Sequence, residues 1–306
     1  MSHRDRMRLQ VLNAPWTERT TLQHANEVHV ENVEQIQEML DLRKDKKRPI
    51  HVVGIAGSNR HPNNPSHETS NSWLMVRKAM EHLSHMGDVT THAFNLPTMN
   101  IEHCNGCYSS AGSLCRFPCD CWPYDDMQDV YAQLTLADVI LFSTPVHSLQ
   151  VGSRLKALID RLISMDGGRF APMYNVDGET WKNPESKNAE QRVSMRGDFR
   201  YVQRLAGKVC AAFCTSKESG SHDVAMKILG AMNGRGCFIP PNAVVGWNSP
   251  RVDKDTAYDK NDFLKALEHG GYLSDRIEDT CNTAVEAARL LRGHETDWML
   301  NMVGRS

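Results

Sequence analysis

Five of the nine cysteines in this 306-residue chain lie close together, in the stretch CNGCYSSAGSLCRFPCDC. Grouped thiolates can bind an iron–sulfur cluster or zinc, or take part in redox chemistry, and free cysteines can also simply pack as small apolar side chains. Gly106 and Gly112 would let such a loop fold back on itself. The residue types leave these uses open. The candidate metal ligands are four of Cys104, Cys107, Cys115, Cys119 and Cys121.

A second group of polar residues follows the apolar run IHVVGIA, in the loop GSNRHPNNPSHETSNS at residues 57–72. The loop leads into a helical pattern, and a helix start offers free N–H groups and a partial positive charge that suit a phosphate. It contains neither G-x-x-x-x-G-K-[ST] nor G-x-G-x-x-G, which argues against a nucleoside triphosphate or the usual dinucleotide. The alternative is that Ser70 or Asn71 only caps the helix. The candidate ligands of a phosphomonoester are Ser58, Arg60, Ser70, Asn71 and Ser72.

Two further loops also follow apolar runs. The stretch STPVHS comes after DVILF, and its extended backbone could lie flat against a planar ring. The stretch CTSKESGSHD ends another apolar run, and its glycine permits close approach of a ligand. Taken alone, His147 is an ordinary loop histidine. The candidate residues of these two loops are Thr144, Pro145, Val146, His147, Ser148, Thr215, Ser216 and Gly220.

The elements between these loops must bring them together. Short apolar runs typical of buried strands alternate with helical patterns, the strands at 50–58, 88–94, 138–143, 207–216 and 243–247. This alternation predicts an α/β fold with a parallel sheet and helices on both faces. In such sheets ligands bind beyond the carboxyl ends of the strands, where all three loops would lie.

Composition limits the function further. A net charge of −2 gives no general attraction to nucleic acid, and no apolar run is long enough to span a membrane. The N-terminus does not resemble a secretory signal, so we expect a cytoplasmic protein with reduced thiols. We expect an N-terminal extension (1–49) whose helix is solvated or contacts another subunit, a main domain (50–250) and a C-terminal helical extension (251–306). The main domain contains the cysteine loop (104–121) and an insertion (166–205) that we expect to be a lid or a subunit contact.

Together the three loops resemble those of the flavodoxin-like fold and, within it, of the NAD(P)H-dependent FMN reductase family, over residues 50–247. The motifs are GSNR…ETSNS, TPVHSLQVGSRLKALIDR and CTSKESGS. The resemblance implies a doubly wound, five-stranded parallel sheet in the order 2-1-3-4-5. The first loop would hold the FMN phosphate, the loop from Pro145 would lie along the ring and ribityl chain, and Thr215, Ser216 and Gly220 would close over the other ring edge. The family usually has an aromatic residue where this chain has His147, and its first loop is usually shorter.

The resemblance also implies the chemistry, which belongs largely to the cofactor. NAD(P)H would reduce the bound FMN, and a small acceptor such as a quinone, flavin or nitro compound would then take the electrons. His147 is the candidate proton or hydrogen-bond donor to that acceptor. The family's sites often lie near a dimer interface, so we expect a homodimer or homotetramer.

The cysteine loop resembles that of the iron–sulfur flavoproteins, in which a compact cysteine run binds a 4Fe–4S cluster near the FMN. Cys104 and Cys107 match that pattern, but Ser110 occupies its third position. A 4Fe–4S cluster, zinc and plain packing therefore all stay open. The competing function is an electron carrier between protein partners, although the small net charge argues mildly against docking to a basic partner.

Overall fold

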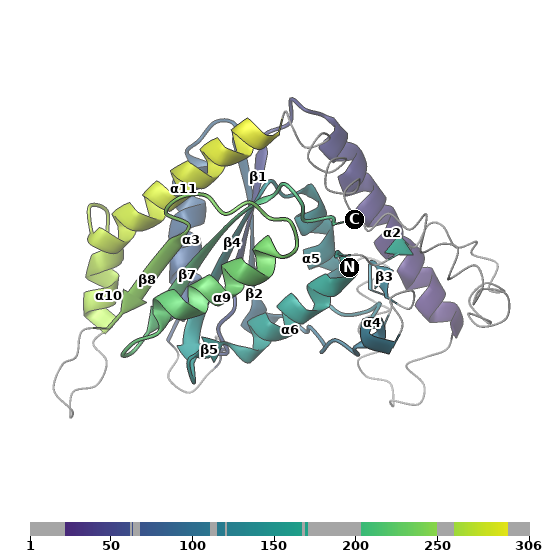
Figure 1. Cartoon of the computed structure of the whole chain (residues 1–306), viewed down its shortest axis with the longest axis horizontal. Coiled ribbons are helices and arrows are strands. Elements are labelled where there is room, and N and C mark those ends of the chain that lie inside the picture. Colours follow the sequence, from purple (N-terminus) through teal and green to yellow (C-terminus); the bar gives the residue numbers. More distant parts are fainter. Residues whose placement is uncertain are drawn as a thin grey trace.

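The computed structural model describes residues 22–61, 63, 68–110, 115–119, 121–166, 169–170, 203–249 and 260–292. A parallel sheet forms the centre of the molecule (Figure 1). Its strands run in the order β2-β1-β4-β7-β8, which confirms the predicted order 2-1-3-4-5. The bounds of these strands are β1 (Ile50–Ala56), β2 (Val89–Asn95), β4 (Val139–His147), β7 (Val209–Ser216) and β8 (Val244–Asn248).

Helices cover both faces of this sheet, as predicted. Figure 1 shows α3 and α11 on one side and α5, α6 and α9 on the other, and α10 precedes α11. The bounds are α3 (Asn71–Ser84), α5 (Met127–Leu136), α6 (Ser153–Arg161), α9 (Ser221–Asn233), α10 (Lys260–Leu267) and α11 (Tyr272–Leu291). The short elements are η2 (Leu96–Thr98), α4 (Cys107–Ser110), β3 (Arg116–Phe117), β5 (Gln150–Val151), η4 (Leu162–Ser164) and β6 (Arg169–Phe170).

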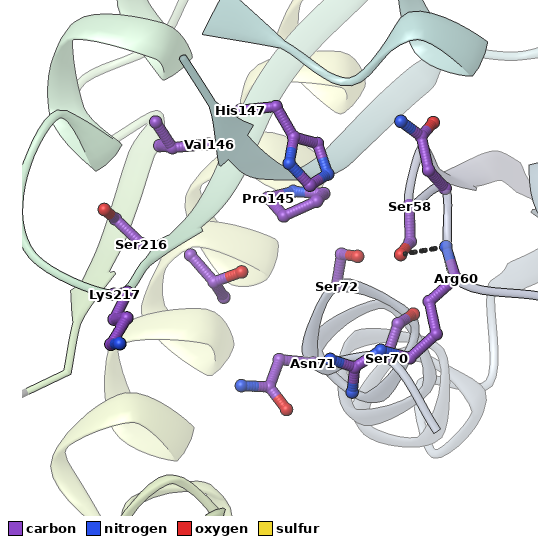
Figure 2. Close-up of a pocket in the computed structure, with 12 residues that line it drawn as sticks. Ser58, Arg60, Ser70, Asn71, Ser72, Pro145, Val146, His147, Ser216 and Lys217 are labelled. Atoms are coloured by element: carbon purple, nitrogen blue, oxygen red, sulfur yellow. Dashed lines mark hydrogen bonds between the residues drawn. The ribbon is translucent and has the colours of Figure 1, made fainter. Parts of the chain in front are cut away.

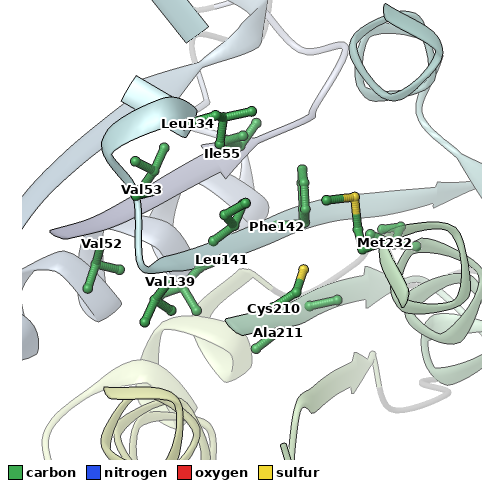
Figure 3. Close-up of a cluster of buried hydrophobic side chains, with 14 of the residues drawn as sticks. Val52, Val53, Ile55, Leu134, Val139, Leu141, Phe142, Cys210, Ala211 and Met232 are labelled. Carbon is green, nitrogen blue, oxygen red and sulfur yellow. The ribbon is translucent and has the colours of Figure 1, made fainter. Parts of the chain in front are cut away.

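The three central strands are apolar along their length because both of their sides are buried. Every residue of β1 is buried, as are the first six of β4 and the first seven of β7. This pattern is typical of parallel strands covered by helices on both faces. Figure 3 shows the resulting core, in which Phe142 of β4 and Met232 of α9 lie between the sheet and its helices. The core holds the strands rigidly, so the loops at their ends have fixed starting points.

The N-terminal helix α2 (Leu22–Lys44) differs from our expectation of a solvated or subunit-contacting helix. It packs against α5 of the same chain, and Ile36 is only 1% exposed within the main core. Helix α11 also contributes to that core, through Ile277 and Cys281 among others. The boundaries proposed at residues 50 and 250 remain predictions, but the described parts of both extensions pack on the main domain.

The elements that were not predicted include helix α10 and the short strand β5. Helix α10 lies in the C-terminal extension, and β5 pairs antiparallel with the end of β4. The turn between β4 and β5 places Ser148 and Leu149 at φ values of 49° and 59°, in the left-handed region. That region disfavours residues with a side chain, and tight hairpins usually place asparagine or glycine there. The hairpin therefore has local backbone strain.

The amino ends of the strands are closed by charged groups around Asp138, which is buried just before β4. Arg48 donates to both of its carboxylate oxygens at 2.7 Å, and Arg292 donates to Oδ2 at 2.6 Å. The amide of His51 donates to the same carboxylate at 2.9 Å, and Arg43 lies 3.7 Å from it. These residues come from α2, from the segment before β1 and from the end of α11. We call Asp138, Arg43, Arg48 and Arg292 the Asp138 cluster.

A second set of contacts at the same edge closes the end of α5. Arg43 donates to the carbonyl of Ala137 at 2.8 Å, and the buried Lys208 donates to the same carbonyl at 2.6 Å. The last carbonyls of a helix lack partners within the helix and carry a partial negative charge, so cations stabilise them. Among the described residues, no helix is both long and apolar enough to cross a membrane.

Candidate functional site

A pocket of about 460 Å³ opens at the carboxyl ends of the strands, where the three loops meet (Figure 2). Two walls face each other across it: Ser58, Arg60 and the start of α3 on one side, and Val146, Ser216 and Lys217 on the other. The structure thus brings together most of the predicted site residues. The lining consists of Ser58, Asn59, Arg60, Ser70, Asn71, Ser72, Pro145, Val146, His147, Thr215, Ser216 and Lys217.

The polar residues at the start of α3 had two proposed roles, capping the helix and binding a phosphate. The hydroxyl of Ser70 accepts a hydrogen bond from the amide of Trp73 at 3.3 Å, so Ser70 is the helix cap. Ser72 is 1% exposed, and its Oγ has no hydrogen-bond partner among the described residues. A buried hydroxyl without a partner costs free energy, typically about 1–3 kcal/mol. Its place in the pocket wall indicates that a bound molecule supplies the partner.

The strand-to-helix loop adds Ser58 and Arg60 to the same wall. The Ser58 hydroxyl accepts from the Arg60 amide at 3.0 Å, which fixes the turn after β1. The Arg60 guanidinium pairs with Glu68 at 2.8 Å, and both side chains are close to half exposed. Glu68 therefore offsets the charge of Arg60. The hydrogen-bond donors of this wall include the hydroxyls at the start of α3.

Asn59 also lines the pocket, and the sequence did not single it out. Its side-chain oxygen accepts from the hydroxyl of Ser153 at 3.2 Å and from the amide of Arg154 at 3.4 Å. Asn59 thereby joins the first loop to the start of α6. The two loops approach closely here, since a Cβ on Gly152 would lie 2.7 Å from the carbonyl oxygen of Gly57. Glycine is required at position 152 by this contact.

The second loop contributes Pro145, Val146 and His147 to the opposite side of the pocket. Thr144, also predicted as a ligand, is fully buried and does not line it. Its hydroxyl accepts from the Gly152 amide at 3.2 Å and lies 3.1 Å from the Pro145 carbonyl. Thr144 therefore shapes the loop from behind. Ser148 lies in the strained hairpin turn and is likewise outside the lining.

The third loop contributes Thr215, Ser216 and Lys217 at the end of β7. Strands β4 and β7 are neighbours with Pro145 opposite Thr215, so the second and third loops lie side by side. Gly220, predicted as a ligand, instead begins α9 at a φ of 89° and packs against Leu149. Lys217 is a lining residue that the sequence analysis did not select, although it lies between two that were selected.

The cysteine loop lies between β2 and α5. The sulfurs of Cys107 and Cys121 are 3.8 Å apart, and the amide of Gly106 donates to the sulfur of Cys104 at 3.4 Å. Burial raises the pKa of the Cys115 thiol, and the neighbouring thiols, Cys107 and Cys119 foremost, raise it further. These neighbours place the predicted cysteines in one cluster, although the spacing along the chain is irregular.

The donor chemistry of this cluster is all thiol, which suits an iron–sulfur centre. Within the described residues, no three His, Cys, Asp or Glu side chains are arranged to hold one metal ion. A 4Fe–4S cluster, zinc and plain packing therefore all stay open for these cysteines.

Two arginines lie beside the cysteine cluster. Arg204 lies over the ring of Phe117, 4.5 Å from its centre, and burial lowers the pKa of Arg204 to about 10, an effect opposed by the charge of Cys115. Arg161 is 1% exposed and pairs with the buried Asp125 at 2.6 Å. Asp125 also accepts from the amide of Glu102 at 3.0 Å, so this pair connects both ends of the cysteine loop to α6.

Most of the insertion at 166–205 lies outside the described residues, so the lid or subunit-contact prediction is not addressed. Its described ends contact the cysteine loop. Strand β6 pairs in parallel with β3 of that loop, and Asp166 forms a bridge with Gln203. The described ends of the insertion therefore support the cysteine loop.

Residues 50–175 match the sequence profile of the NADPH-dependent FMN reductase family. An iron–sulfur flavoprotein of Methanocaldococcus jannaschii is 29% identical over 110 residues, which are 36% of this chain and 50% of that protein. An iron–sulfur flavoprotein of Methanosarcina thermophila is 25% identical over 156 residues, 50% of this chain and 74% of the relative. The chain thus spans about half the length of the first relative. The matches confirm the resemblance predicted from the loops and the cysteine run.

Among solved structures, the crystal structure of RosB with bound 8-demethyl-8-formylriboflavin-5′-phosphate aligns with 84% of this chain and 85% of its own. The TM-score is 0.55 and the sequence identity is 17%. At that identity the likeness concerns the fold alone. Together with the strand order, it confirms the flavodoxin-like architecture.

Proposed function

Because residues 50–175 carry a domain of the NADPH-dependent FMN reductase family, we propose that the chain is a flavin-dependent oxidoreductase. It would pass electrons from NAD(P)H through bound FMN to a small acceptor such as a quinone, a flavin or a nitro compound. The family match covers residues 50–175, whereas the proposed activity concerns the whole chain.

One observation carries this proposal: the buried hydroxyl of Ser72, which has no partner among the described residues, lies in the wall of a pocket at the start of α3. Helix starts bind phosphates through free amides and the helix dipole. The pocket volume, about 460 Å³, lies within the range of cofactor sites. The residues present therefore fit FMN, with its phosphate held by Ser58, Arg60, Ser70, Asn71 and Ser72.

The remaining lining residues would hold the ring. FMN held here would supply the chemistry of hydride uptake from the nicotinamide and electron transfer to the acceptor. Pro145 and Val146 offer an apolar edge, and Thr215 and Ser216 lie beside them because β4 and β7 are neighbours. His147 is exposed at the pocket, where its imidazole would donate a proton or hydrogen bond to the acceptor.

Flavin binding tests the proposal directly. Purified protein stripped of flavin is titrated with FMN and with riboflavin, and quenching of flavin fluorescence is followed. We expect one FMN per chain and much weaker binding of riboflavin, which lacks the phosphate. No uptake of FMN would overturn the proposed function. Equal binding of both compounds would overturn the assignment of the phosphate to the start of α3.

Turnover then separates an enzyme from a carrier. The FMN-loaded protein is mixed with NADPH or NADH and a panel of quinone, flavin and nitro acceptors, and loss of nicotinamide absorbance is recorded. Steady oxidation of either nicotinamide with at least one acceptor supports the reductase. A protein that binds FMN but oxidises neither nicotinamide would be a carrier.

The cysteine cluster favours a second candidate, an iron–sulfur flavoprotein that carries electrons between protein partners. Four of Cys104, Cys107, Cys115, Cys119 and Cys121 would hold a 4Fe–4S cluster, whose single-electron chemistry suits such transfer. The names of the two curated relatives support this candidate. Iron and acid-labile sulfide are counted in protein purified without oxygen. Four of each per chain would support the cluster, and neither would leave a simple flavin reductase.

We also propose a homodimer or homotetramer, on the family resemblance alone. Light scattering of the FMN-loaded protein at several concentrations gives the mass directly. A mass of one chain, 34.5 kDa, at all concentrations would contradict this part of the proposal.

A further inference from the structure

Lys217 is distinct among the charged groups of the pocket. The lining contains two permanent cations, Arg60 and Lys217, and no carboxylate. Arg60 is paired with Glu68 at 2.8 Å. Within the part of the chain that the structure describes, Lys217 makes no hydrogen bond or ion pair and its side chain is exposed. Of these two cations, Lys217 is the one whose charge no described carboxylate offsets.

Lys217 lies at one end of the pocket. Figure 2 shows Lys217 beside Ser216, across the pocket from Ser58 and Ser72. A phosphate at the start of α3 would occupy the Ser72 side. The part of the ligand farthest from its phosphate would then reach the side of Lys217. In FMN that part is the ring.

A flavin ring gains negative charge when it accepts a hydride, and it is close to neutral before. A nearby ammonium group stabilises the charged form more than the neutral one. We propose that Lys217 stabilises the reduced form of the bound flavin and thereby raises the reduction potential of the site. This inference rests on the proposed function.

The size of the expected effect on flavin binding depends on the exposure of the Lys217 side chain. At a solvent-exposed site the interaction of two unit charges is weak, and it strengthens with burial. Replacing Lys217 should therefore weaken the binding of reduced FMN on the order of tenfold relative to oxidised FMN. For a two-electron couple a tenfold change corresponds to about 30 mV.

The test compares Lys217→Gln with two other variants. Lys217→Arg keeps the charge, and Lys265→Gln removes the same charge from α10, outside the pocket. For each FMN-loaded protein, the midpoint potential is measured by equilibration with a reference dye and the Kd of oxidised FMN by fluorescence quenching. We expect Lys217→Gln to lower the potential by about 30 mV with the oxidised Kd changed less than twofold, and both other variants to match the wild type.

The outcomes separate this inference from the proposed function. A Lys217→Gln potential equal to that of the wild type would overturn the role of Lys217 while FMN binding stands. Equal weakening of oxidised and reduced FMN would also overturn it, because Lys217 would then act on the phosphate. An unchanged potential with a raised KM for NADPH would assign Lys217 to the donor instead. A wild-type protein that takes up no FMN would overturn both.

Discussion

At the amino ends of the strands, the carboxylate of Asp138 receives hydrogen bonds from two arginines and a backbone amide. At the carboxyl ends, the buried hydroxyl of Ser72 has no partner among the described residues, and two adjacent residues of the β4–β5 hairpin adopt left-handed conformations. At the amino edge the Asp138 carboxylate is paired with its arginines, although the Nε atoms of Arg48 and Arg292 have no hydrogen-bond partner among the described residues. The carboxyl edge combines the unpartnered hydroxyl of Ser72 with a strained turn beside the pocket.

We attribute the difference between the two edges to the presence of the pocket at the carboxyl edge. Unsatisfied buried groups and strained backbone both cost free energy, and proteins retain them mainly at functional sites. The Asp138 cluster lies at the amino ends of the strands, at the opposite edge of the sheet from the pocket. Variants of the Asp138 cluster should therefore change stability without changing flavin binding, and loss of the Ser72 hydroxyl should do the reverse.

The largest effect should come from Asp138→Ala. Loss of the carboxylate leaves Arg48 and Arg292 partly buried without their anion, and removing one partner of a buried pair typically costs about 3–5 kcal/mol. We expect the free energy of unfolding to fall by roughly 3 kcal/mol, measured by urea denaturation, with the Kd for FMN within twofold of wild type.

The matched control for this variant is Asp41→Ala. Asp41 pairs with Lys44 at 2.6 Å, but both side chains are more than half exposed, and such pairs contribute about 0–1 kcal/mol. A loss at Asp138 no larger than that at Asp41 would contradict the role given to the Asp138 cluster.

Acid should remove the same stabilisation gradually. Burial alone would raise the pKa of Asp138, but the hydrogen bonds from Arg48 and the His51 amide outweigh burial and lower the pKa from 3.8 to about 2. A depressed carboxylate pKa stabilises the fold fully above the unfolded value and loses that contribution as pH falls through the folded value. Asp138 should therefore contribute roughly 2 kcal/mol above pH ~4, lost towards pH ~2.

The measurement for this prediction is urea unfolding at a series of pH values between ~4 and ~2, on the wild type and on Asp138→Asn. The asparagine variant should start with lower stability and decline less over this interval. Parallel curves for the two proteins would show that the acid sensitivity arises from other carboxylates.

Ser72→Ala should have the opposite signature. A hydrogen bond to a charged group contributes about 1.5–3 kcal/mol, so loss of the hydroxyl should raise the Kd for FMN roughly thirtyfold. Stability without ligand should not fall, because the hydroxyl has no internal partner to lose. Fluorescence titration and urea unfolding give the two quantities.

Ser84→Ala, at the other end of α3, is the control for this variant. Its hydroxyl donates to the carbonyl of Glu81 at 2.7 Å on the helix surface, away from the pocket, so FMN binding should not change. A Ser72 variant that loses stability but retains flavin affinity would mean that the two edges do not differ as described.

The smallest effect should come from relieving the hairpin strain. Leu149 has a φ of 59° and is 60% exposed, so Leu149→Asn removes little packing and introduces a residue that tolerates the left-handed region. We expect a gain of about 0.5–1 kcal/mol in the free energy of unfolding. Leu149→Ala lacks the side-chain amide that lets asparagine adopt the left-handed region, so it should give no gain. Equal stability of the two variants would mean that the turn is not strained.

Much of the scaffold could be predicted because its signals are local. The runs IHVVGIA and DVILF are apolar throughout, as buried parallel strands require, and their alternation with helical patterns led to the sheet. The pocket followed from a general property of such sheets, since loops after neighbouring strands meet at one edge. Ser72 and His147 were found in this way.

Other features depend on contacts that no local pattern contains. The Asp138 cluster joins residues from α2, the start of β1 and the end of α11, and arginines at those positions look like solvated charges in the sequence. Lys217 was passed over for the same reason, since a lysine after a strand is usually a surface residue. Thr144 was selected because it lies just past a strand, where an extended backbone could lie against a planar ring. Its hydroxyl accepts from the Gly152 amide, and Thr144 is outside the pocket lining.

The contact between Arg292 and the carbonyls of Arg48 and Pro49 joins residues 244 and 243 positions apart. A ribosome makes the chain from its N-terminus, so β1 and Asp138 emerge long before the residue that completes their edge. During that interval the first strands are exposed without the helix α11 that later covers them. Final folding of this domain therefore waits for nearly the whole chain, and nascent chains that stall before residue 292 should depend on chaperones.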